Sequence, residues 1–326
     1  MRFQILALSG GGYLGLFTAQ ILAELERQAG VPIAQCFDLI AGTSIGGIIA
    51  LGLGQEVSTQ TIRDSFVTNG SAIFSARKRP KTRAGALWDA LKFIAKPKYD
   101  GTALRRTCST LLGEDSLLGA SRHRLLIPVI NMTTGSVQML KTAHHPDFVK
   151  DHQLRMVDVA LATSAAPTYF PLAEINDYLC ADGGLAANAP DLCALHEATH
   201  FLRQEQHEIH ILSIGTTTAG FSISHQTGRD LGAFDWISSG RLFSTMISAQ
   251  QQLTTYILDH RLGTNYVRID AVQSPEQQAD LGLDVATEQA AKTIAGLADG
   301  VLRRISKDPR IGQILSHRAP SPQFYA

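Results

Sequence analysis

The sequence has 326 residues, of which 44% are hydrophobic, so the chain can bury a substantial core and is globular rather than disordered. Its 29 Lys and Arg residues balance 29 Asp and Glu residues, and this zero net charge gives no reason to expect a nucleic acid polymer as a partner. The four cysteines show neither paired spacing nor neighbouring histidines, which argues against a metal site and a disulfide framework and is typical of a reducing cytoplasm.

The first predicted element is a buried parallel strand over residues 3–9, because this short apolar run ends in a cluster of glycines. Residues 16–28 follow with the apolar spacing of a helix, and Gly30 is expected to end it. A second apolar strand, over residues 37–41, leads into the glycine-containing segment 42–47, and an apolar helix over residues 48–54 comes next. The start of the chain therefore predicts a β-α-β-α unit with parallel strands.

The rest of the chain predicts more strands and helices, without an internal repeat. Strands are expected at residues 124–130, 137–142, 179–180 and 209–214, and helices at residues 155–163, 191–204, 236–258 and 286–306. Residues 39–53 are the longest apolar stretch and are too short for a membrane span of about 20 residues, so we expect the protein to touch membranes without crossing them.

These elements predict one domain over residues 1–326, with a three-layer α/β/α fold around a mostly parallel sheet. Two parts stand out within it. Residues 75–100 are first basic and then apolar, which predicts an inserted or mobile surface segment, and the part from about residue 233 to 326 is expected to be helical. The active site is expected at the carboxyl ends of the first two strands.

The segment Gly42-Thr43-Ser44-Ile45-Gly46 matches G-x-S-x-G, the pattern of a nucleophile elbow. In such an elbow a sharp turn from strand to helix exposes a serine hydroxyl, and Gly42 and Gly46 avoid clashes at the corner. Ordinary glycine turns with a capping serine give the same pattern, but here an apolar strand precedes it and a helix follows it. We therefore predict that Ser44 is the nucleophile of an acyl-transfer reaction.

A second glycine loop, residues 9–15, also lies between a strand and a helix, where backbone N–H groups can face an anion. Gly10, Gly12 and Gly15 satisfy the fingerprint G-x-G-x-x-G, which is typical of a dinucleotide-binding protein. That fingerprint also needs an acidic residue at the end of the second strand, whereas Asp38 stands at its beginning.

The other interpretation of this loop is an oxyanion hole beside Ser44. In an oxyanion hole, N–H groups such as those of Gly10, Gly11 and Gly12 stabilise the negative charge that develops on an attacked carbonyl oxygen. Adjacent parallel strands would place the two glycine loops side by side. A tight turn without a catalytic role is the third interpretation.

The proton acceptor is expected to be Asp182 rather than a histidine. Residues 178–181 are typical of a short strand that leads into Asp182-Gly183-Gly184, and Asp-Gly by itself is a common turn signal. Beside a nucleophile elbow, however, a buried carboxylate can act as the general base, with a pKa set by neighbouring N–H donors and by desolvation. None of the 11 histidines lies in a glycine-rich strand end. Ser44 and Asp182 thus predict a two-residue site that needs no metal and no other cofactor.

Together, the three motifs resemble the patatin-like phospholipase family, in which a glycine-rich oxyanion loop, a G-x-S-x-G serine and a D-G-[GA] aspartate occur in this order. Similar supporting stretches lie at residues 162–171, 188–190 and 212–216, so the resemblance covers roughly residues 3–217. It implies a patatin-like three-layer fold and hydrolysis of lipid acyl esters through a Ser-Asp dyad, with an acyl-enzyme intermediate. A catalytically inactive lipid-binding relative with the same fold is an alternative.

One position departs from the family pattern. The family usually carries Arg or Lys where this chain has Leu14. The backbone N–H donors survive this change, so it leaves ester hydrolysis intact. Without a cation at this position, the loop gives no reason to expect a preference for phospholipid over a neutral ester.

Residues 6–12 and 98–105 are similar to a bacterial branch of the family that degrades membrane phospholipid when a cyclic dinucleotide, made during phage infection, activates it. The resemblance implies a cyclic dinucleotide as activator, membrane phospholipid or another lipid ester as substrate, and action from the cytoplasm at the inner membrane surface. A homo-oligomer is also expected, with residues 236–258 as core or oligomer contact. The basic run Arg77–Arg83, close to Trp88 and Phe93, is either a contact for anionic headgroups or nucleotide phosphate or a solvated surface.

Overall fold

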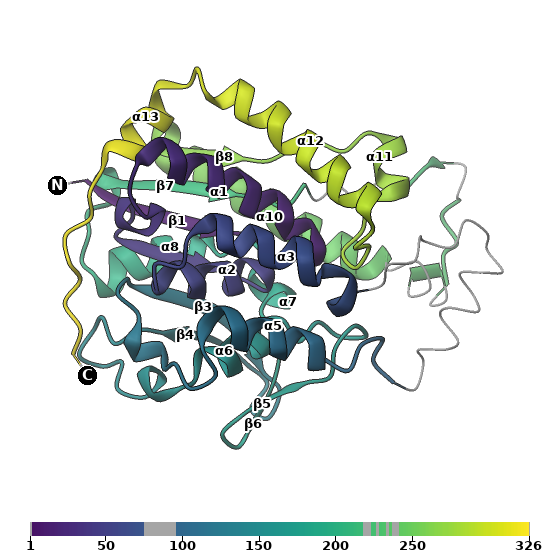
Figure 1. The fold of residues 1–326 in the computed structure, drawn as a ribbon, viewed down its shortest axis with the longest axis horizontal. Helices are drawn as coiled ribbons and strands as arrows, with labels where there is room; N and C mark the ends of the chain where they lie inside the picture. Colours follow the sequence, from purple (N-terminus) through teal and green to yellow (C-terminus); the bar gives the residue numbers. More distant parts are fainter. Residues whose placement is uncertain are drawn as a thin grey trace.

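The computed structural model describes residues 2–74, 96–217, 223–225, 228–232, 235–236 and 241–325. The strands of its sheet are β1 (Phe3–Leu8), β2 (Leu39–Gly42), β3 (Leu125–Asn131), β4 (Ser136–Lys141), β5 (Ala173–Ile175), β6 (Tyr178–Asp182), β7 (Ile209–Ile214) and β8 (Tyr266–Ile269). They form one eight-stranded sheet in the order β5-β6-β3-β2-β1-β7-β8, with β4 paired to β3 outside this path (Figure 1).

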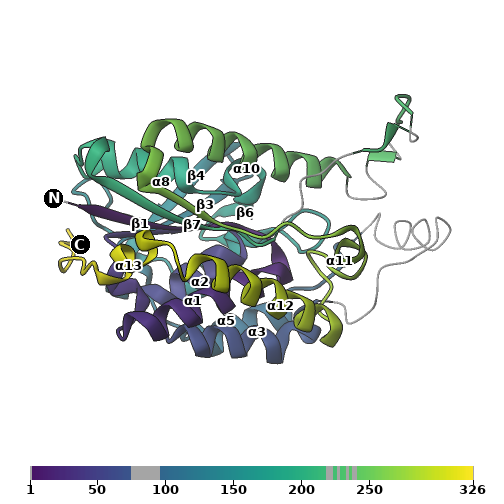
Figure 2. The ribbon, with the colours of Figure 1, turned by 90° about the horizontal axis from the view of Figure 1, so that it is seen from above.

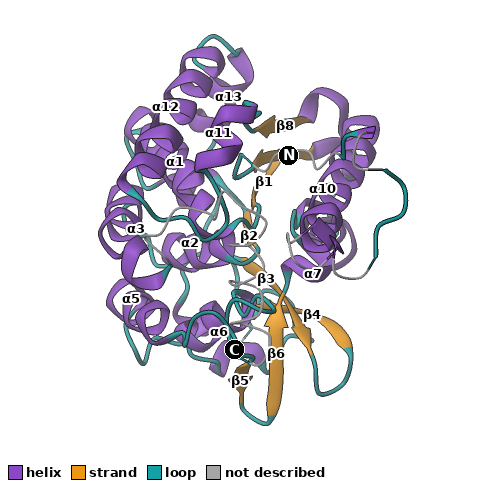
Figure 3. Cartoon of the chain, turned by 90° about the vertical axis from the view of Figure 1, so that its right-hand side faces the viewer, coloured by secondary structure: helices purple, strands orange, loops and turns teal. Residues whose placement is uncertain are grey.

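Helices cover both faces of the sheet. They are α1 (Gly15–Ala29), α2 (Ile45–Gly54), α3 (Thr59–Ile73), α5 (Thr102–Leu112), α6 (Met156–Thr163), α7 (Gly184–Ala187), α8 (Asp191–His196), α10 (Arg241–Leu262), α11 (Pro275–Asp280), α12 (Glu288–Ile305) and α13 (Pro309–Ser316). Seen edge-on in Figure 2, the sheet lies between α8 and α10 on one side and α1, α2, α3, α5 and α12 on the other. Figure 3 shows the same layers from the side, so the expected α/β/α architecture is confirmed.

The parallel part of the sheet is its centre. β1 lies between β2 and β7 and is parallel to both, with Leu8 paired to Gly42 on one side and to Ile214 on the other. All six residues of β1 are buried, which explains why the strand is a continuous apolar run rather than an alternating one. The pairs of β3 with β4 and β6, and of β5 with β6, are antiparallel. The expectation of a mostly parallel sheet therefore holds for the part that carries the glycine loops.

Some elements differ from the sequence-based expectation. One helix was expected over residues 191–204. In the structure the α-helix α8 ends at His196, and a π-helical turn over Glu197–Phe201 follows it. The C-terminal part, expected to be helical, also contains a strand, β8, which joins the sheet. The helices α3 and α5 were not predicted from the sequence. The basic run Arg77–Arg83, with Trp88 and Phe93, lies outside the described residues. None of the helices in the described ranges has the length and hydrophobicity needed to cross a bilayer.

Candidate active site

The turn between β2 and α2 has the geometry of a nucleophile elbow. β2 ends at Gly42 and α2 begins at Ile45, so the chain reverses from strand to helix within two residues. Ser44 has φ 55° and ψ −125°, a conformation that residues with a side chain rarely adopt. Its N–H donates to Thr163 Oγ1 at 3.0 Å, which helps to hold the strained turn. Ser44 lines a pocket at the carboxyl ends of β1 and β2.

The two glycines of the elbow are required by close approach. A Cβ on Gly42 would lie 2.2 Å from the carbonyl oxygen of Gly46, and a Cβ on Gly46 would lie 2.3 Å from that of Leu8. Both neighbours are backbone atoms, so the clash could not be relieved by moving a side chain. The first turn of α2 can therefore pack onto the ends of β1 and β2 only because these two positions lack side chains.

The sheet brings Asp182 to the elbow from the opposite direction. β2 and β6 share one edge of β3, because β4 pairs along the other edge. Ala41 is paired with Leu126, and Asp182 with Val129, three residues further along β3. β2 runs parallel to β3 and β6 runs antiparallel to it, so the carboxyl ends of β2 and β6 point toward each other. Ser44 and Asp182 meet there although 138 positions separate them in the sequence.

Ser44 and Asp182 form a direct hydrogen bond. Ser44 Oγ donates to Asp182 Oδ2 at 2.7 Å, and the Gly184 N–H donates to Asp182 Oδ1 at 2.7 Å. The Asp182 residue is only 3% exposed. Burial raises the pKa of its carboxyl to about 7, and the hydrogen bonds from Gly184 and Ser44 oppose this rise. The site thus holds a hydroxyl beside a carboxyl that can both accept and release a proton near neutral pH.

The glycines after Asp182 are also explained by packing. A Cβ on Gly183 would lie 2.2 Å from the carbonyl oxygen of Pro128 in β3. A Cβ on Gly184 would lie 2.9 Å from Asn188 Oδ1 and 3.0 Å from Asp182 Oδ1. The Asp-Gly-Gly turn can therefore lie against β3 and still donate a backbone N–H to the carboxylate.

The first glycine loop contributes fewer free donors than expected. The Gly10 N–H donates to the carbonyl oxygen of Asn188 at 2.9 Å, so it is already occupied, and the expectation that Gly10 is an oxyanion donor is corrected. Gly11 and Gly12 line the same pocket as Ser44, and their N–H groups have no acceptor within the described ranges. Gly12 has φ 56°, and a Cβ there would lie 2.1 Å from the carbonyl oxygen of Leu283. The available donors are those of Gly11 and Gly12.

The pocket beside Ser44 and Asp182 has mostly apolar walls and an empty volume of about 790 Å³, part of which is open to solvent. Among the side chains that line it are Phe66, Phe74, Tyr169, Phe170, Phe243 and Ile247. None of the described residues in its wall is a histidine, and no three metal-ligating side chains cluster anywhere in the described ranges. The pocket can accommodate an apolar chain, with polar groups gathered at the Ser44 end.

The acidic residue of the dinucleotide fingerprint is in the wrong place. Asp38 precedes β2, whereas the glycine loop follows the carboxyl end of β1, so the two lie at opposite ends of neighbouring parallel strands. Its Oδ2 accepts the Gln4 N–H at 2.8 Å and lies 2.9 Å from His317 Nε2. The carboxylate is therefore a structural link and does not face the glycine loop.

Leu14 occupies the position where the resembled family carries a cation. Leu14 is 4% exposed and belongs to the apolar core that includes residues of α1 and α2. Its N–H donates to the carbonyl oxygen of Gly11 at 3.1 Å, which closes the loop as a short 3-10 turn. The backbone of the loop is thus intact at Leu14, and the side chain serves packing.

Three residues near the site had no role assigned from sequence. Thr163 accepts the Ser44 N–H, and its own hydroxyl donates to the carbonyl oxygen of Pro128 at 2.7 Å. Asn188 and Thr216 both contact Gly10. All three lie in stretches of sequence that resemble the patatin-like family. That resemblance indicated the segments but not which atoms their side chains contact.

Comparison with known proteins places the chain in a family. The family model described as patatin-like phospholipase matches residues 6–191, a range that includes both Ser44 and Asp182. A cGAMP-activated phospholipase from Pseudomonas aeruginosa is 41% identical over 325 residues, covering 99% of this chain and 95% of the relative. Relatives with the same description from Vibrio cholerae and Escherichia coli are 36% and 34% identical, each covering 90% of this chain and 88% and 87% of the relative. This chain therefore belongs to the patatin-like phospholipase family.

Proposed function

We propose that this protein is a lipid acyl hydrolase that cleaves phospholipid esters, with Ser44 as nucleophile and Asp182 as general base. The observation that carries the proposal is the 2.7 Å hydrogen bond from Ser44 Oγ to Asp182 Oδ2 at the end of an apolar pocket. A hydroxyl bonded to a carboxylate can lose its proton as it attacks, and apolar walls suit an acyl chain. Relatives named as phospholipases, which match over nearly the whole chain, support the substrate class.

In the first half of the reaction, Ser44 Oγ forms a bond to the ester carbonyl carbon while its proton passes to Asp182. The carbonyl oxygen becomes an oxyanion, which the N–H groups of Gly11 and Gly12 stabilise. The intermediate then collapses, the bond between the carbonyl carbon and the alcohol oxygen breaks, and the leaving alcohol takes the proton from Asp182. The products are an acylated Ser44 and a free lysolipid.

In the second half, water attacks the acyl group on Ser44 and gives its proton to Asp182. A second oxyanion forms at the same two N–H groups and collapses with cleavage of the bond to Ser44 Oγ. Ser44 regains its proton from Asp182, and the fatty acid leaves. Asp182 accepts and returns one proton in each half, a task suited to a carboxyl whose pKa lies at about 7.

A cyclic dinucleotide as activator completes the proposal. Its support is that three relatives named cGAMP-activated phospholipases match 90% or more of this chain, including the part beyond the family model that ends at residue 191. The biological role that follows is degradation of membrane phospholipid at the inner membrane surface in response to a cyclic dinucleotide made during phage infection.

The proposed nucleophile is tested by Ser44→Ala. We expect this substitution to lower kcat for ester hydrolysis by at least about 10³-fold and to abolish labelling by a fluorophosphonate, because the attacking oxygen is lost. Ser316→Ala, at an exposed position of α13, is the matched control and should behave like the unaltered protein. Undiminished hydrolysis by Ser44→Ala would exclude Ser44. Absence of both hydrolysis and labelling in the unaltered protein, with and without activator, would instead favour an inactive lipid-binding protein.

The proposed base is tested separately by Asp182→Asn. This change keeps the shape of the side chain and removes its ability to take a proton. We expect fluorophosphonate labelling and ester hydrolysis both to fall by at least about 10²-fold. Near-normal hydrolysis by Asp182→Asn, combined with loss of activity in a single His→Ala variant, would show that the base is a histidine.

A further inference from the structure

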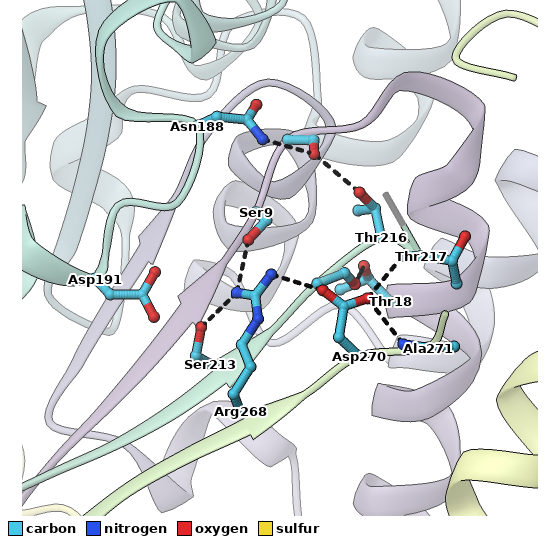
Figure 4. Close-up of polar contacts among 12 residues, drawn as sticks. Ser9, Thr18, Asn188, Asp191, Ser213, Thr216, Thr217, Arg268, Asp270 and Ala271 are labelled. Atoms are coloured by element: carbon cyan, nitrogen blue, oxygen red, sulfur yellow. Dashed lines mark hydrogen bonds and ion pairs between the residues drawn. The ribbon is translucent and has the colours of Figure 1, made fainter. Parts of the chain in front are cut away.

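Gly10 is held by hydrogen bonds at both of its backbone polar atoms. Its N–H donates to the carbonyl oxygen of Asn188 at 2.9 Å. Its carbonyl oxygen accepts from Asn188 Nδ2 at 3.3 Å and from Thr216 Oγ1 at 3.0 Å. Figure 4 draws these two bonds as dashed lines from the labelled Asn188 and Thr216. Asn188 and Thr216 are buried, at 2% and 0% exposure, so water does not compete for these bonds.

The carbonyl of Gly10 and the N–H of Gly11 belong to one planar trans peptide, in which the two groups point in opposite directions. Any contact that fixes the direction of the Gly10 carbonyl therefore fixes the direction of the Gly11 N–H. Asn188 and Thr216 bind the carbonyl, and Gly11 lines the pocket that contains Ser44. The two side chains thus determine where one of the proposed oxyanion donors points.

This peptide needs external support because glycines flank it. Gly10, Gly11 and Gly12 have no side chains to restrict their backbone dihedrals, so a rotated peptide that hides the Gly11 N–H is sterically accessible to the loop alone. Thr216 opposes rotation in a second way, since it packs against Gly11. A Cβ on Gly11 would lie 2.2 Å from Thr216 Oγ1 and 2.6 Å from its Cβ.

The structure assigns to Asn188 and Thr216 the role of positioning residues for the oxyanion hole: together they fix the Gly10–Gly11 peptide with its N–H toward the substrate carbonyl. This inference rests on the proposed function, because it concerns the oxyanion that forms when Ser44 attacks. Neither side chain takes part in proton transfer. Their effect is to set the donor in place before the reaction begins.

Asn188 also links the base to the oxyanion loop. It follows Asp182 by six positions, after the short helix α7, so one segment supplies both the carboxylate and the hold on Gly10. α10 packs beside this segment and holds it: Gln250 Oε1 accepts the Asn188 N–H at 3.1 Å, and Gln250 Nε2 donates to the carbonyl oxygen of Leu185 at 2.8 Å.

The start of the glycine loop is anchored by a partly buried arginine of β8. Arg268 Nη1 donates to Ser9 Oγ at 2.9 Å and to Ser213 Oγ at 2.7 Å, and Nη2 donates to Asp270 Oδ2 at 2.8 Å (Figure 4). Asp270 Oδ1 in turn accepts the Thr217 N–H at 2.9 Å, directly after Thr216. Arg268 and Asp270 therefore connect the start of the glycine loop to the segment that carries Thr216, which limits the movement of one against the other.

The test is Thr216→Val, which keeps the shape of the side chain and removes its donor, compared with Thr216→Ser, which keeps the donor. We expect Thr216→Val to lower kcat about 10-fold with KM unchanged, and Thr216→Ser to restore most of the loss. Asn188→Leu should cause a similar loss, and the double variant at least about 100-fold. Thr110→Val, at an exposed position of α5, is the matched control.

A second readout separates positioning from general damage to the fold. A trifluoromethyl ketone analogue of the acyl ester adds reversibly to the serine hydroxyl and places an oxyanion in the hole. Its Ki should rise in parallel with the fall in kcat/KM, while the pH midpoint of activity stays the same and each variant remains folded at the assay temperature. Should Thr216→Val fail to fold, Asn188→Leu carries the same comparison.

The outcomes separate this inference from the proposed function. If Thr216→Val and Asn188→Leu keep the normal kcat and Ki while Ser44→Ala is inactive, the positioning role is wrong and the hydrolase stands. The role is also wrong if the variants change only KM or only the pH midpoint. If Ser44→Ala stays active, the proposed function itself fails.

Discussion

Asp182 is 3% exposed, and burial raises the pKa of its carboxyl from an ordinary 3.8 to about 7. A general base acts only as the carboxylate, so kcat/KM should rise as the pH increases through about 7 and then level off. A solvated carboxylate would place this rise near pH 4. The measurement is hydrolysis of an uncharged, water-soluble ester between pH 5 and 9, with Asp299→Asn, at an exposed position of α12, as control. A flat profile over this range would contradict the assignment.

The same shift in the pKa of Asp182 affects stability. Below pH 3.8 the carboxyl is protonated in both the folded and the unfolded chain. Between pH 4 and 7 the unfolded chain ionises while the folded protein stays protonated, so the free energy of unfolding falls as the pH rises. A difference of about three pKa units corresponds to about 4 kcal/mol. Asp182→Asn should therefore unfold at higher denaturant concentration than the unaltered protein at pH 8, and this advantage should vanish near pH 4.

At the scale of elements, the site depends on how closely α2 approaches the end of β1. A Cβ on Gly46 would lie 2.3 Å from the carbonyl oxygen of Leu8 and 2.8 Å from that of Ser9. Because these atoms are backbone, Gly46→Ala must push the helix away from the strand and separate the elbow from the glycine loop. We expect a loss of about 1–3 kcal/mol in the free energy of unfolding and a fall in kcat of at least 10-fold.

Gly296 provides the control for this substitution. It lies at an exposed position of α12, and a Cβ there would meet nothing within 4 Å. Gly296→Ala should stabilise the protein by about 0.5–1 kcal/mol, because alanine loses less conformational entropy in a helix. Equal effects of the two substitutions in urea unfolding would show that α2 and β1 tolerate a wider separation than the structure indicates.

At the scale of the whole molecule, the pocket is assembled from segments that span most of the chain. Its walls extend from Gly11 in the first loop to Leu283 before α12, and α3 and α10 contribute Phe66 and Phe243 between them. A ligand that shifts any of these elements can open or close access to Ser44. The proposed activation by a cyclic dinucleotide is therefore expected to depend on segments from both halves of the chain.

Activation is measured by the release of fatty acid from vesicles of phosphatidylethanolamine and phosphatidylglycerol, with a panel of cyclic dinucleotides and their linear counterparts. We expect cyclic GMP-AMP to raise the rate at least about 10-fold over the rate without nucleotide, and the linear dinucleotide to leave it unchanged. Equal rates across the panel would exclude the proposed activation and leave the hydrolase proposal standing. Ser44→Ala serves as the background for every member of the panel.

Much of the local structure follows from short-range patterns. The apolar run of β1 and the glycine that ends α1 identify these elements without knowledge of their neighbours, and Gly30 indeed ends α1 with φ 66°. The pairing of strands does not follow in the same way. β6 was expected as a strand, but its antiparallel register on β3, which carries Asp182 to Ser44, depends on contacts between distant segments.

The error at Gly10 has the same origin. The Gly10 N–H was counted among the oxyanion donors, because nothing in the sequence distinguishes Gly10 from Gly11 and Gly12. The carbonyl that occupies this N–H belongs to Asn188, 178 positions away. A donor is available only if no acceptor reaches it, and this is a property of the folded chain.

Sequence by itself determined the nucleophile elbow around Ser44 and the turn at Asp182, because a tight corner needs glycine whatever surrounds it. It also indicated the family, since three ordered motifs carry that information. Only the tertiary structure decided that Asp182 meets Ser44, that the N–H groups of Gly11 and Gly12 have no acceptor among the described residues, and that the Asp182 carboxyl has a pKa of about 7. Hydrogen-bond partners and desolvation depend on residues far apart in the chain, so no local pattern encodes them.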